Sequence, residues 1–323
     1  MTTPPDEFAW IERLKPLTRG DPRALDLGDD AAVIPGRAGH DLVVSVDGMV
    51  EGVHFLGDEA PLVIAKRLLR TSLSDIAAKA AEPFGYFMLA SWPEDRSWDY
   101  RDAFIRGLAE DGEAFGISLL GGDTVGTPGP MTVSATVLGW CPEGRVVRRS
   151  GASPGDLAMV CGVIGDGWLG LKAARGDIAD PSGRLATHYR TPTPLLGLRA
   201  LLRQSAHAAA DVSDGLVADV GHIARASGLG LELDLELMPL SPDALAWCAG
   251  QADPAAARLI LATGGDDYAI VCAVAPSDES AFAREAARLG IPAAAVGVFD
   301  RSTGVRVAVG GRAMRADKPG WSH

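Results

Sequence analysis

The sequence predicts a mixed α/β (α+β) protein of two domains, and three observations carry this prediction. Segments with helical periodicity alternate with short apolar runs typical of strands along the whole chain. The chain has 323 residues, and a domain usually contains about 100–200. Residues 141–155 interrupt the pattern with a run rich in glycine, proline and arginine. We therefore place one domain at residues 1–148 and a second at 149–323.

In the first domain, residues 8–17 show the amphipathic pattern of a short helix. Residues 20–40 are rich in glycine, proline and aspartate and predict a loop around a short strand. Residues 41–47 predict a buried strand that ends in Asp47, and residues 61–81 place apolar side chains on one helical face. The other predicted elements are strands at 84–90, 117–120 and 131–139 and a helix at 98–115.

The second domain begins with a strand at 157–161, a glycine-rich turn at 162–167 and a helix that starts at Trp168. Backbone amides in such a turn can bind a phosphate, but a plain strand-to-helix turn has the same composition. The remaining predictions are helices at 195–202, 214–226, 242–262 and 278–289, and strands at 208–213, 229–235, 268–273 and twice between 293 and 308.

The charge balance argues against a nucleic-acid-binding protein, because the formal net charge is −12 and such proteins usually carry a basic face. The nearest basic cluster, Arg145, Arg148 and Arg149, suits one polyphosphate better than a duplex. The four cysteines include no C-x-x-C pair, which favours a reducing compartment. Residues 1–6 do not resemble a signal peptide, and no apolar run approaches the ~20 residues of a membrane span. We expect a cytoplasmic protein without membrane partners.

Aspartates recur beside small residues at predicted strand ends and turns. A single aspartate in a turn is usually a local cap, and Asp30 and Asp214 fit that role. Asp75 does not, because it lies inside an apolar helical stretch, where an unpaired charge is unfavourable. The strings that contain these aspartates are residues 28–32, 45–48, 73–76, 121–124, 211–216 and 264–268.

Several converging carboxylates would require bound cations, since two like charges ~4 Å apart repel by about 4 kcal/mol at an effective dielectric constant of 20. Oxygen ligands select a hard metal, Mg²⁺ first, with Mn²⁺ or Ca²⁺ as alternatives. Mg²⁺ held by carboxylates usually also binds substrate phosphates. The sequence therefore indicates an enzyme that handles nucleotides. The sequence contains neither the P-loop string nor the protein-kinase strings H-R-D and D-F-G.

Seven motifs in order resemble one known family. They are GDDAAVI, SVDGMVEGVHF, LSDIAA, GGDT, RRSGASPGD, DVSDGL and GGDDY. From about residue 6 to the C-terminus the chain resembles the thiamine-monophosphate kinase family, within the wider group that includes aminoimidazole ribonucleotide synthetase. The resemblance implies an N-terminal sheet-and-helix domain that dimerises and a C-terminal α/β sandwich domain. It also implies Mg²⁺-dependent transfer of the γ-phosphoryl group of ATP to thiamine monophosphate, by a homodimer.

The resemblance further implies a role for each matching residue. Asp30, Asp47, Asp75, Asp123 and Asp211 would be catalytic because they hold metal for direct in-line transfer. The full set of metal ligands would be Asp30, Ser45, Val46 through its backbone, Asp47, Asp75, Asp123, Asp211 and Asp214. The ATP contacts would be Gly122, Asp123, Arg149 and Ser213, and the contacts to thiamine monophosphate would be His54, Asp266 and Trp321.

Three positions depart from the family pattern without removing a metal carboxylate. Asp266 stands where the family usually has the longer glutamate, which puts its contact with the thiamine portion in question. Val46 replaces a frequent threonine, which a backbone ligand tolerates, and Ala80 replaces a common glycine.

The residues by themselves leave other interpretations open. Arg149 also fits a solvated linker, His54 a core histidine, and Trp321 a disordered tail. A catalytically silent metal- or nucleotide-binding module, a phosphohydrolase and an aminoimidazole ribonucleotide synthetase are the alternatives. A selenophosphate synthetase is disfavoured because no cysteine precedes Cys141, and the hydrogenase-maturation relative because the chain does not end in cysteine.

Overall fold

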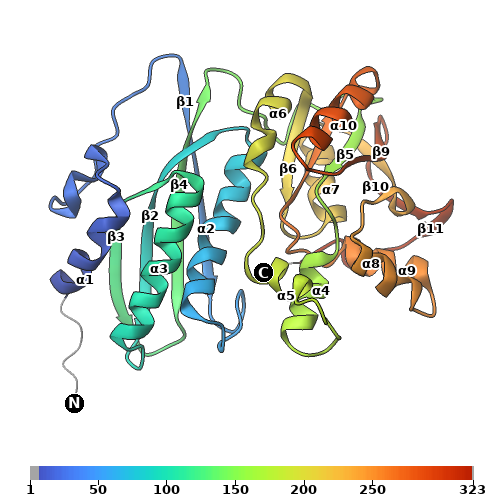
Figure 1. Cartoon of the computed structure of the whole chain (residues 1–323). Coiled ribbons are helices and arrows are strands. Elements are labelled where there is room, and N and C mark those ends of the chain that lie inside the picture. The colour runs from blue at the N-terminus through green and yellow to red at the C-terminus, as the bar shows by residue number, and fades with distance from the viewer. Residues whose placement is uncertain (1–6, 322–323) are drawn as a thin grey trace. The chain divides into compact units, whose positions relative to one another are not determined.

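The computed structural model describes residues 7–321 and divides into two compact units (Figure 1). Unit 1 extends to Ile76 and resumes at Ala81–Gly144, and unit 2 contains Ala77–Ala80 and the chain from Arg145 onward. The described range does not include residues 1–6 and 322–323. The expectations about a signal peptide and about a terminal cysteine concern these residues. Both units combine helices with a sheet, so the predicted mixed α/β fold is confirmed.

Unit 1 is built on a four-stranded sheet in the order β1-β4-β2-β3. β1 and β2 both pair antiparallel with β4, and β3 pairs parallel with β2. Helices α2 and α3 cover one face (Figure 1). The elements are α1 (Glu7–Leu14), β1 (His40–Val50), α2 (Pro61–Ala78), β2 (Glu82–Pro93), α3 (Trp98–Phe115), β3 (Ser118–Thr127) and β4 (Thr132–Pro142), with short 3-10 helices at Lys15–Thr18 and Pro22–Leu27.

Along β4, every second side chain points into the core of unit 1. Val133, Ala135 and Val137 of β4 are buried, whereas the residues between them are half-buried. Leu69 and Leu73 of α2 are fully buried, as the helical periodicity predicts.

Two predictions for unit 1 are wrong. The segment 20–40 contains the 3-10 helix Pro22–Leu27 and not a strand, because Pro22 begins a helical turn capped by the side chain of Asp21. The strand predicted at 41–47 is also not buried. It continues to Val50 as an edge strand, with Leu42, Val44 and Val46 exposed on one side.

Unit 2 is built on a seven-stranded mixed sheet in the order β11-β10-β7-β9-β5-β8-β6. Helices cover both faces, so β8 is buried at every position and its residues alternate between two cores. Val271 faces the core shared with α7, and Cys272 faces the core shared with α6 and α10. The strands are β5 (Leu157–Cys161), β6 (Ala206–Val212), β7 (Gly230–Asp234), β8 (Ala269–Val274), β9 (Ala293–Asp300), β10 (Gly304–Val309) and β11 (Arg312–Met314).

The helices of unit 2 are α4 (Asp166–Ala174), α5 (Arg184–Arg190), α6 (Arg199–Ser205), α7 (Leu216–Ala226), α8 (Pro242–Ala249), α9 (Pro254–Ala262) and α10 (Glu279–Arg288), with 3-10 turns at Leu196–Leu198, Leu235–Leu237 and Pro276–Asp278. The single helix predicted at 242–262 is two helices, because the Asp253 side chain accepts the amides of Ala255 and Ala256 and starts α9 at Pro254. The sequence did not predict α5 or β11.

Candidate functional site

A pair of carboxylates lies between β1 and α2 in unit 1. The Ser45 hydroxyl on β1 donates a hydrogen bond to the Asp75 carboxylate on α2, so the strand and the helix are tied together at this point. Burial and the negative charge of Asp75 raise the pKa of Asp47 to about 6, against a smaller lowering by a hydrogen bond from Ser72. The structure therefore brings Ser45, Asp47 and Asp75 together, as the sequence predicted. The Asp47–Asp75 repulsion is the condition that a bound cation would relieve.

Gly122 and Asp123 lie on β3, at the opposite edge of the sheet from β1. The register aligns Asp47 with Ala135, Ala135 with Met88, and Met88 with Gly122. Three strand spacings of about 4.8 Å separate the ends of this row by roughly 14 Å. Over such a distance, Asp47 and Asp123 are too far apart to ligate one and the same ion directly.

The predicted strand at 117–120 was too short, and the GGDT motif lies inside β3. A Cβ atom at Gly122 would stand 1.9 Å from the carbonyl oxygen of Met88, and the φ of Gly122 is +156°. Only glycine allows β2 to approach this closely. The side chain of Asp123 is exposed, and its Oδ1 accepts the amide of Thr124 at 2.8 Å.

The other predicted residues of unit 1 lie in accessible positions. Asp30 is exposed in a loop, and its amide donates to Oδ1 of Asp29 at 2.8 Å. Val46 is exposed on β1. His54 lies in the turn after β1 and not on a strand, and its Nδ1 accepts the amide of Val50 at 3.1 Å. With Nδ1 as acceptor, the neutral imidazole carries its proton on Nε2.

The predicted residues of unit 2 gather around the loop that follows β6. Asp211 is buried at the end of the strand. The carbonyl of Ser213 accepts the amide of Asp266 at 2.8 Å, and the carbonyl of Asp214 accepts the amide of Trp321 at 2.9 Å. Three segments far apart in the sequence, around residues 213, 266 and 321, therefore meet within one unit.

Asp219 and His222 are functional candidates that the sequence reasoning missed. Potential ligand atoms of Asp214, Asp219 and His222 lie within 4.8 Å of one another. Burial and the charge of Asp214 raise the pKa of Asp219 to about 7. Burial, with the positive charges of Arg149 and Arg225, lowers the pKa of His222. The three-residue spacing of Asp219 and His222 on a predicted helix was the available signal, since such residues share a helical face.

Asp214 was a candidate helix cap, and this expectation is wrong. The N-cap of α7 is Gly215, which has no side-chain cap bond. Instead, Asp219 Oδ2 accepts the amides of Asp214 at 3.1 Å and Gly215 at 3.2 Å from within the helix. The Asp214 carboxylate is therefore not used as the cap of α7.

The hypothesis that the turn at 162–167 binds a phosphate is also contradicted. The amides of Gly165 and Gly167 donate to Oδ1 of Asp267 at 2.8 and 2.9 Å. A carboxylate of the chain itself takes the place that a phosphate would occupy.

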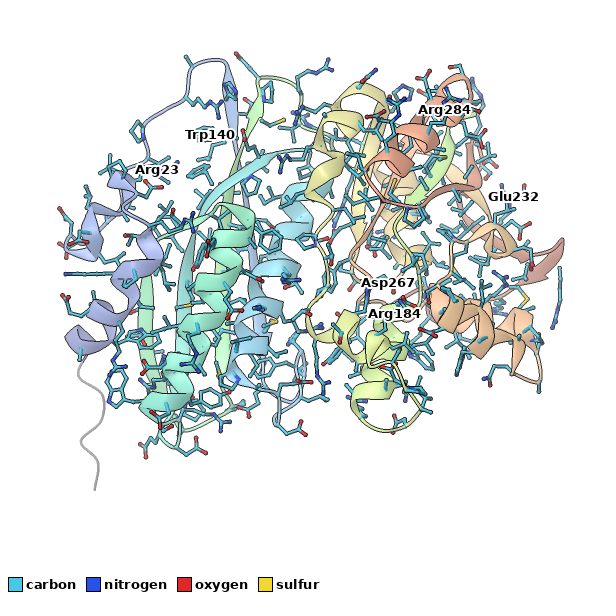
Figure 2. All side chains as sticks on the ribbon, viewed as in Figure 1. Arg23, Trp140, Arg184, Glu232, Asp267 and Arg284 are labelled. Atoms are coloured by element: carbon cyan, nitrogen blue, oxygen red, sulfur yellow. The ribbon has the colours of Figure 1, made fainter. Side chains whose placement is uncertain are left out.

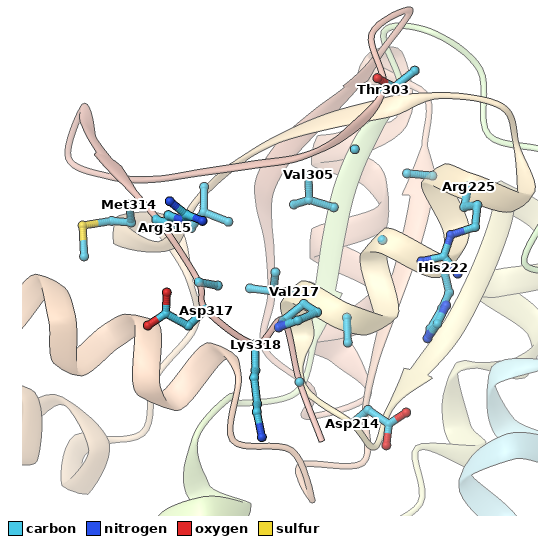
Figure 3. Close-up of a pocket in the computed structure, with 18 of the residues that line it drawn as sticks. Asp214, Val217, His222, Arg225, Thr303, Val305, Met314, Arg315, Asp317 and Lys318 are labelled. Atoms are coloured by element: carbon cyan, nitrogen blue, oxygen red, sulfur yellow. The ribbon is translucent and has the colours of Figure 1, made fainter. Parts of the chain in front are cut away.

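A cavity of about 840 Å³ in unit 2 extends from the loop after β6 along α7 (Figure 3). Asp214 and Trp321 line it together with apolar side chains that include Val217 and Val305. Lys318 lies toward the Asp214 end and Thr303 at the far end in this view (Figure 3). Arg149 is exposed, and its charge acts on both Asp219 and His222.

Comparisons with known proteins give the same order of domains. The model of the AIR synthase related protein N-terminal domain matches residues 28–141, and that of the C-terminal domain matches residues 153–310. A thiamine-monophosphate kinase from Caulobacter vibrioides is 55% identical over 321 residues, which cover 99% of this chain and 91% of that protein. The chain belongs to the thiamine-monophosphate kinase family.

Solved structures of the family have the same fold. The crystal structure of thiamine-monophosphate kinase from Stenotrophomonas maltophilia K279a has a TM-score of 0.84 and 34% identity, over 95% of this chain and 98% of that one. AaThiL complexed with AMPPCP and TMP has a TM-score of 0.77 and 26% identity, over 98% of this chain and 96% of that one. These likenesses confirm the resemblance and the two-domain architecture that it implied. In residues 7–321, no helix combines the length and apolar character that a membrane span needs.

Proposed function

We propose that the chain transfers the γ-phosphoryl group of ATP to the phosphate of thiamine monophosphate, which yields thiamine diphosphate and ADP. The observation that carries the proposal is the 55% identity to the thiamine-monophosphate kinase of Caulobacter vibrioides across 99% of this chain. AaThiL, a structural relative, is described in complex with AMPPCP and TMP. The acidic site residues described above suit a reaction between two phosphate anions.

The donor set fits Mg²⁺ by its chemistry. Burial first, and repulsion by the Asp75 carboxylate second, raise the pKa of Asp47, and a bound cation would offset both effects. When bound, Mg²⁺ would neutralise charge on the phosphates and favour in-line attack. We assign the binding of several Mg²⁺ ions, with Asp47 and Asp123 on different ions, to Asp30, Ser45, the Val46 carbonyl, Asp47, Asp75, Asp123, Asp211 and Asp214.

The remaining assignments concern the two substrates. Gly122 and Asp123 would bind ATP on β3, and Ser213 and Arg149 would bind its phosphates, with the guanidinium forming two parallel hydrogen bonds. Because the acceptor phosphate is already anionic at neutral pH, none of these residues has to act as a strong base.

Three residues would bind thiamine monophosphate. His54 would contact the phosphate, and its ring is oriented by Nδ1, which accepts the amide of Val50. Asp266 and Trp321 would contact the thiamine portion, supported by their place beside Ser213 and Asp214. The Tyr268 hydroxyl donates to Asp266 Oδ1 at 2.9 Å and orients the shorter side chain that stands in place of the family's usual glutamate.

We also propose a homodimer formed through unit 1. β1 is an edge strand with Leu42, Val44 and Val46 exposed by 42, 50 and 62%. An exposed apolar edge is a template for pairing with another chain. Light scattering after gel filtration would measure the mass, and Val44→Lys should shift the dimer toward monomer.

The activity is tested by incubating the chain with Mg-ATP and thiamine monophosphate and separating the products by liquid chromatography. Thiamine diphosphate should appear only when metal, ATP and acceptor are all present. ADP formed without consumption of the acceptor would contradict the proposal and favour a phosphohydrolase.

A further inference from the structure

Asp267 is a buried carboxyl group that none of the assignments above uses. Its side chain joins two segments, because Oδ1 accepts the amide of Gly165 at 2.8 Å and that of Gly167 at 2.9 Å. The residue is 3% exposed, and Oδ2 has no hydrogen-bond partner in the described part of the chain. The side chain therefore acts as a fixed link between the loop 264–268 and the start of α4.

The first turn of α4 is itself held firmly. The carboxylate of Asp166, fully buried, accepts Nη1 of Arg184 at 2.8 Å and the hydroxyl of Ser241 at 2.6 Å. Arg184 and Asp267 are both labelled in Figure 2. A Cβ atom at Gly167 would stand 2.2 Å from the carbonyl oxygen of Asp266, so the helix and the loop are in direct backbone contact. Movement of the first turn of α4, to which Asp267 is hydrogen-bonded, would therefore be transmitted to the backbone of Asp266.

The residues on either side of Asp267 have strained backbones. Asp266 has a φ of +66° and Tyr268 a φ of +50°, in the left-handed region that non-glycine residues rarely adopt. Their amides donate to the carbonyls of Ser213 and Val212, each at 2.8 Å. Such conformations persist only where the surroundings hold them, and they concentrate at functional sites. Here the hydrogen bonds to the β6 loop hold one side, and Asp267 holds the other.

We propose that Asp267 is a positioning residue for acceptor binding. By linking the loop 264–268 to α4, it keeps the backbone of Asp266 in the conformation that presents the Asp266 carboxylate to thiamine monophosphate. Asp267 itself touches no substrate. This inference rests on the proposed kinase function, because it assigns Asp267 to the same acceptor site.

The test compares Asp267→Ala and Asp267→Asn with wild type in steady-state assays in which thiamine monophosphate and ATP are varied separately. The asparagine oxygen can accept the same two amides, whereas alanine accepts none. We expect Asp267→Ala to raise KM for thiamine monophosphate about 10-fold and KM for ATP less than about 2-fold, and Asp267→Asn to restore both within about 2-fold. Should the alanine variant not fold, Asp267→Ser is used, since its shorter side chain cannot reach both amides.

The matched control is Asp253→Ala. Asp253 also accepts two helix-start amides, those of Ala255 and Ala256, but at α9. Its replacement should lower the melting temperature and leave both KM values unchanged. Equal rises in the two KM values for Asp267→Ala, or an asparagine variant as impaired as the alanine variant, would overturn the proposal.

A second measurement keeps this inference separable from the proposed function. Amide hydrogen exchange at residues 165–167 and 264–268 should accelerate in Asp267→Ala and stay near wild type in Asp267→Asn. Unchanged exchange would refute the link even if wild type phosphorylates no thiamine monophosphate. Local acceleration without a change in acceptor KM would show that the link exists but does not position Asp266, which also overturns the proposal. If wild type lacks the activity, the proposed function fails, and with it the acceptor role of Asp267.

Discussion

The amide of Trp321 donates to the carbonyl oxygen of Asp214 at 2.9 Å, which ties the C-terminal segment to the loop between β6 and α7. The backbone of Trp321 is fixed, but its side chain stays 58% exposed at the edge of the cavity along α7. A large aromatic residue that is anchored through its backbone and stays exposed beside a cavity is suited to contact a ligand.

Replacement of this ring should weaken acceptor binding. We expect Trp321→Ala to raise KM for thiamine monophosphate by about 10-fold, because loss of an aromatic stacking interaction costs roughly 1 kcal/mol or more of binding free energy. Trp321→Phe keeps an aromatic ring and should stay within about 3-fold of wild type. The control is Trp247→Ala, which removes a half-buried ring that packs on Trp168 against the core of unit 2. That variant should lose stability without a change in KM, and a similar KM effect in both would argue against the role of Trp321.

Removal of the Asp47 carboxylate should lower turnover sharply. Asp47→Asn keeps the shape of the side chain but removes the charge that we assign to metal binding, so kcat should fall by about 100-fold or more. Asp41→Asn is the matched control, because Asp41 lies on the same strand and its side chain accepts the backbone amide of Gly144 at 2.9 Å. Activity in Asp47→Asn close to that of Asp41→Asn would contradict the metal assignment.

The raised pKa of Asp47 predicts a pH dependence in the metal-free protein. Its pKa is about 6 in the folded protein, against 3.8 for an ordinary aspartate. The native state therefore binds more protons between these values, and stability falls as pH rises through this window, by roughly 2–3 kcal/mol. Added Mg²⁺ should bind more tightly as pH rises toward 6 and level off above it. Denaturant unfolding from pH 4 to 7.5 measures the slope, which should be smaller in Asp47→Asn.

Local sequence patterns predicted most helices and strands, but they failed where contacts distant in the sequence determine the burial of an element. The helix at 98–115 matches α3, because its apolar periodicity and its Ser97 cap are local features. The exposure of β1 could not be predicted, because an apolar strand has the same sequence pattern at the edge of a sheet as at its centre.

For the site, too, the sequence indicated which residues belong to it but not which contacts they make. Ser45, Asp47 and Asp75 were found through motifs and do lie together, but the pattern alone did not reveal the bond between Ser45 and Asp75. Asp267 was visible in the sequence as a second aspartate in GGDDY. Its burial against Gly165 and Gly167, 102 and 100 residues away, is a property of the fold.

Gly122 provides the last prediction, because it sets how closely β2 and β3 approach beside Asp123. In Gly122→Ala the new Cβ would stand 1.9 Å from the carbonyl oxygen of Met88, so the strands must separate. We expect a loss of about 2–3 kcal/mol in the free energy of unfolding and a weaker affinity for ATP. Gly126→Ala is the control on the same strand, since a Cβ there meets nothing within 4 Å. Chemical denaturation and ATP titration measure both variants. Equal stability and affinity in the two would show that β3 accommodates a side chain at position 122, and would remove the packing argument for a glycine at that position.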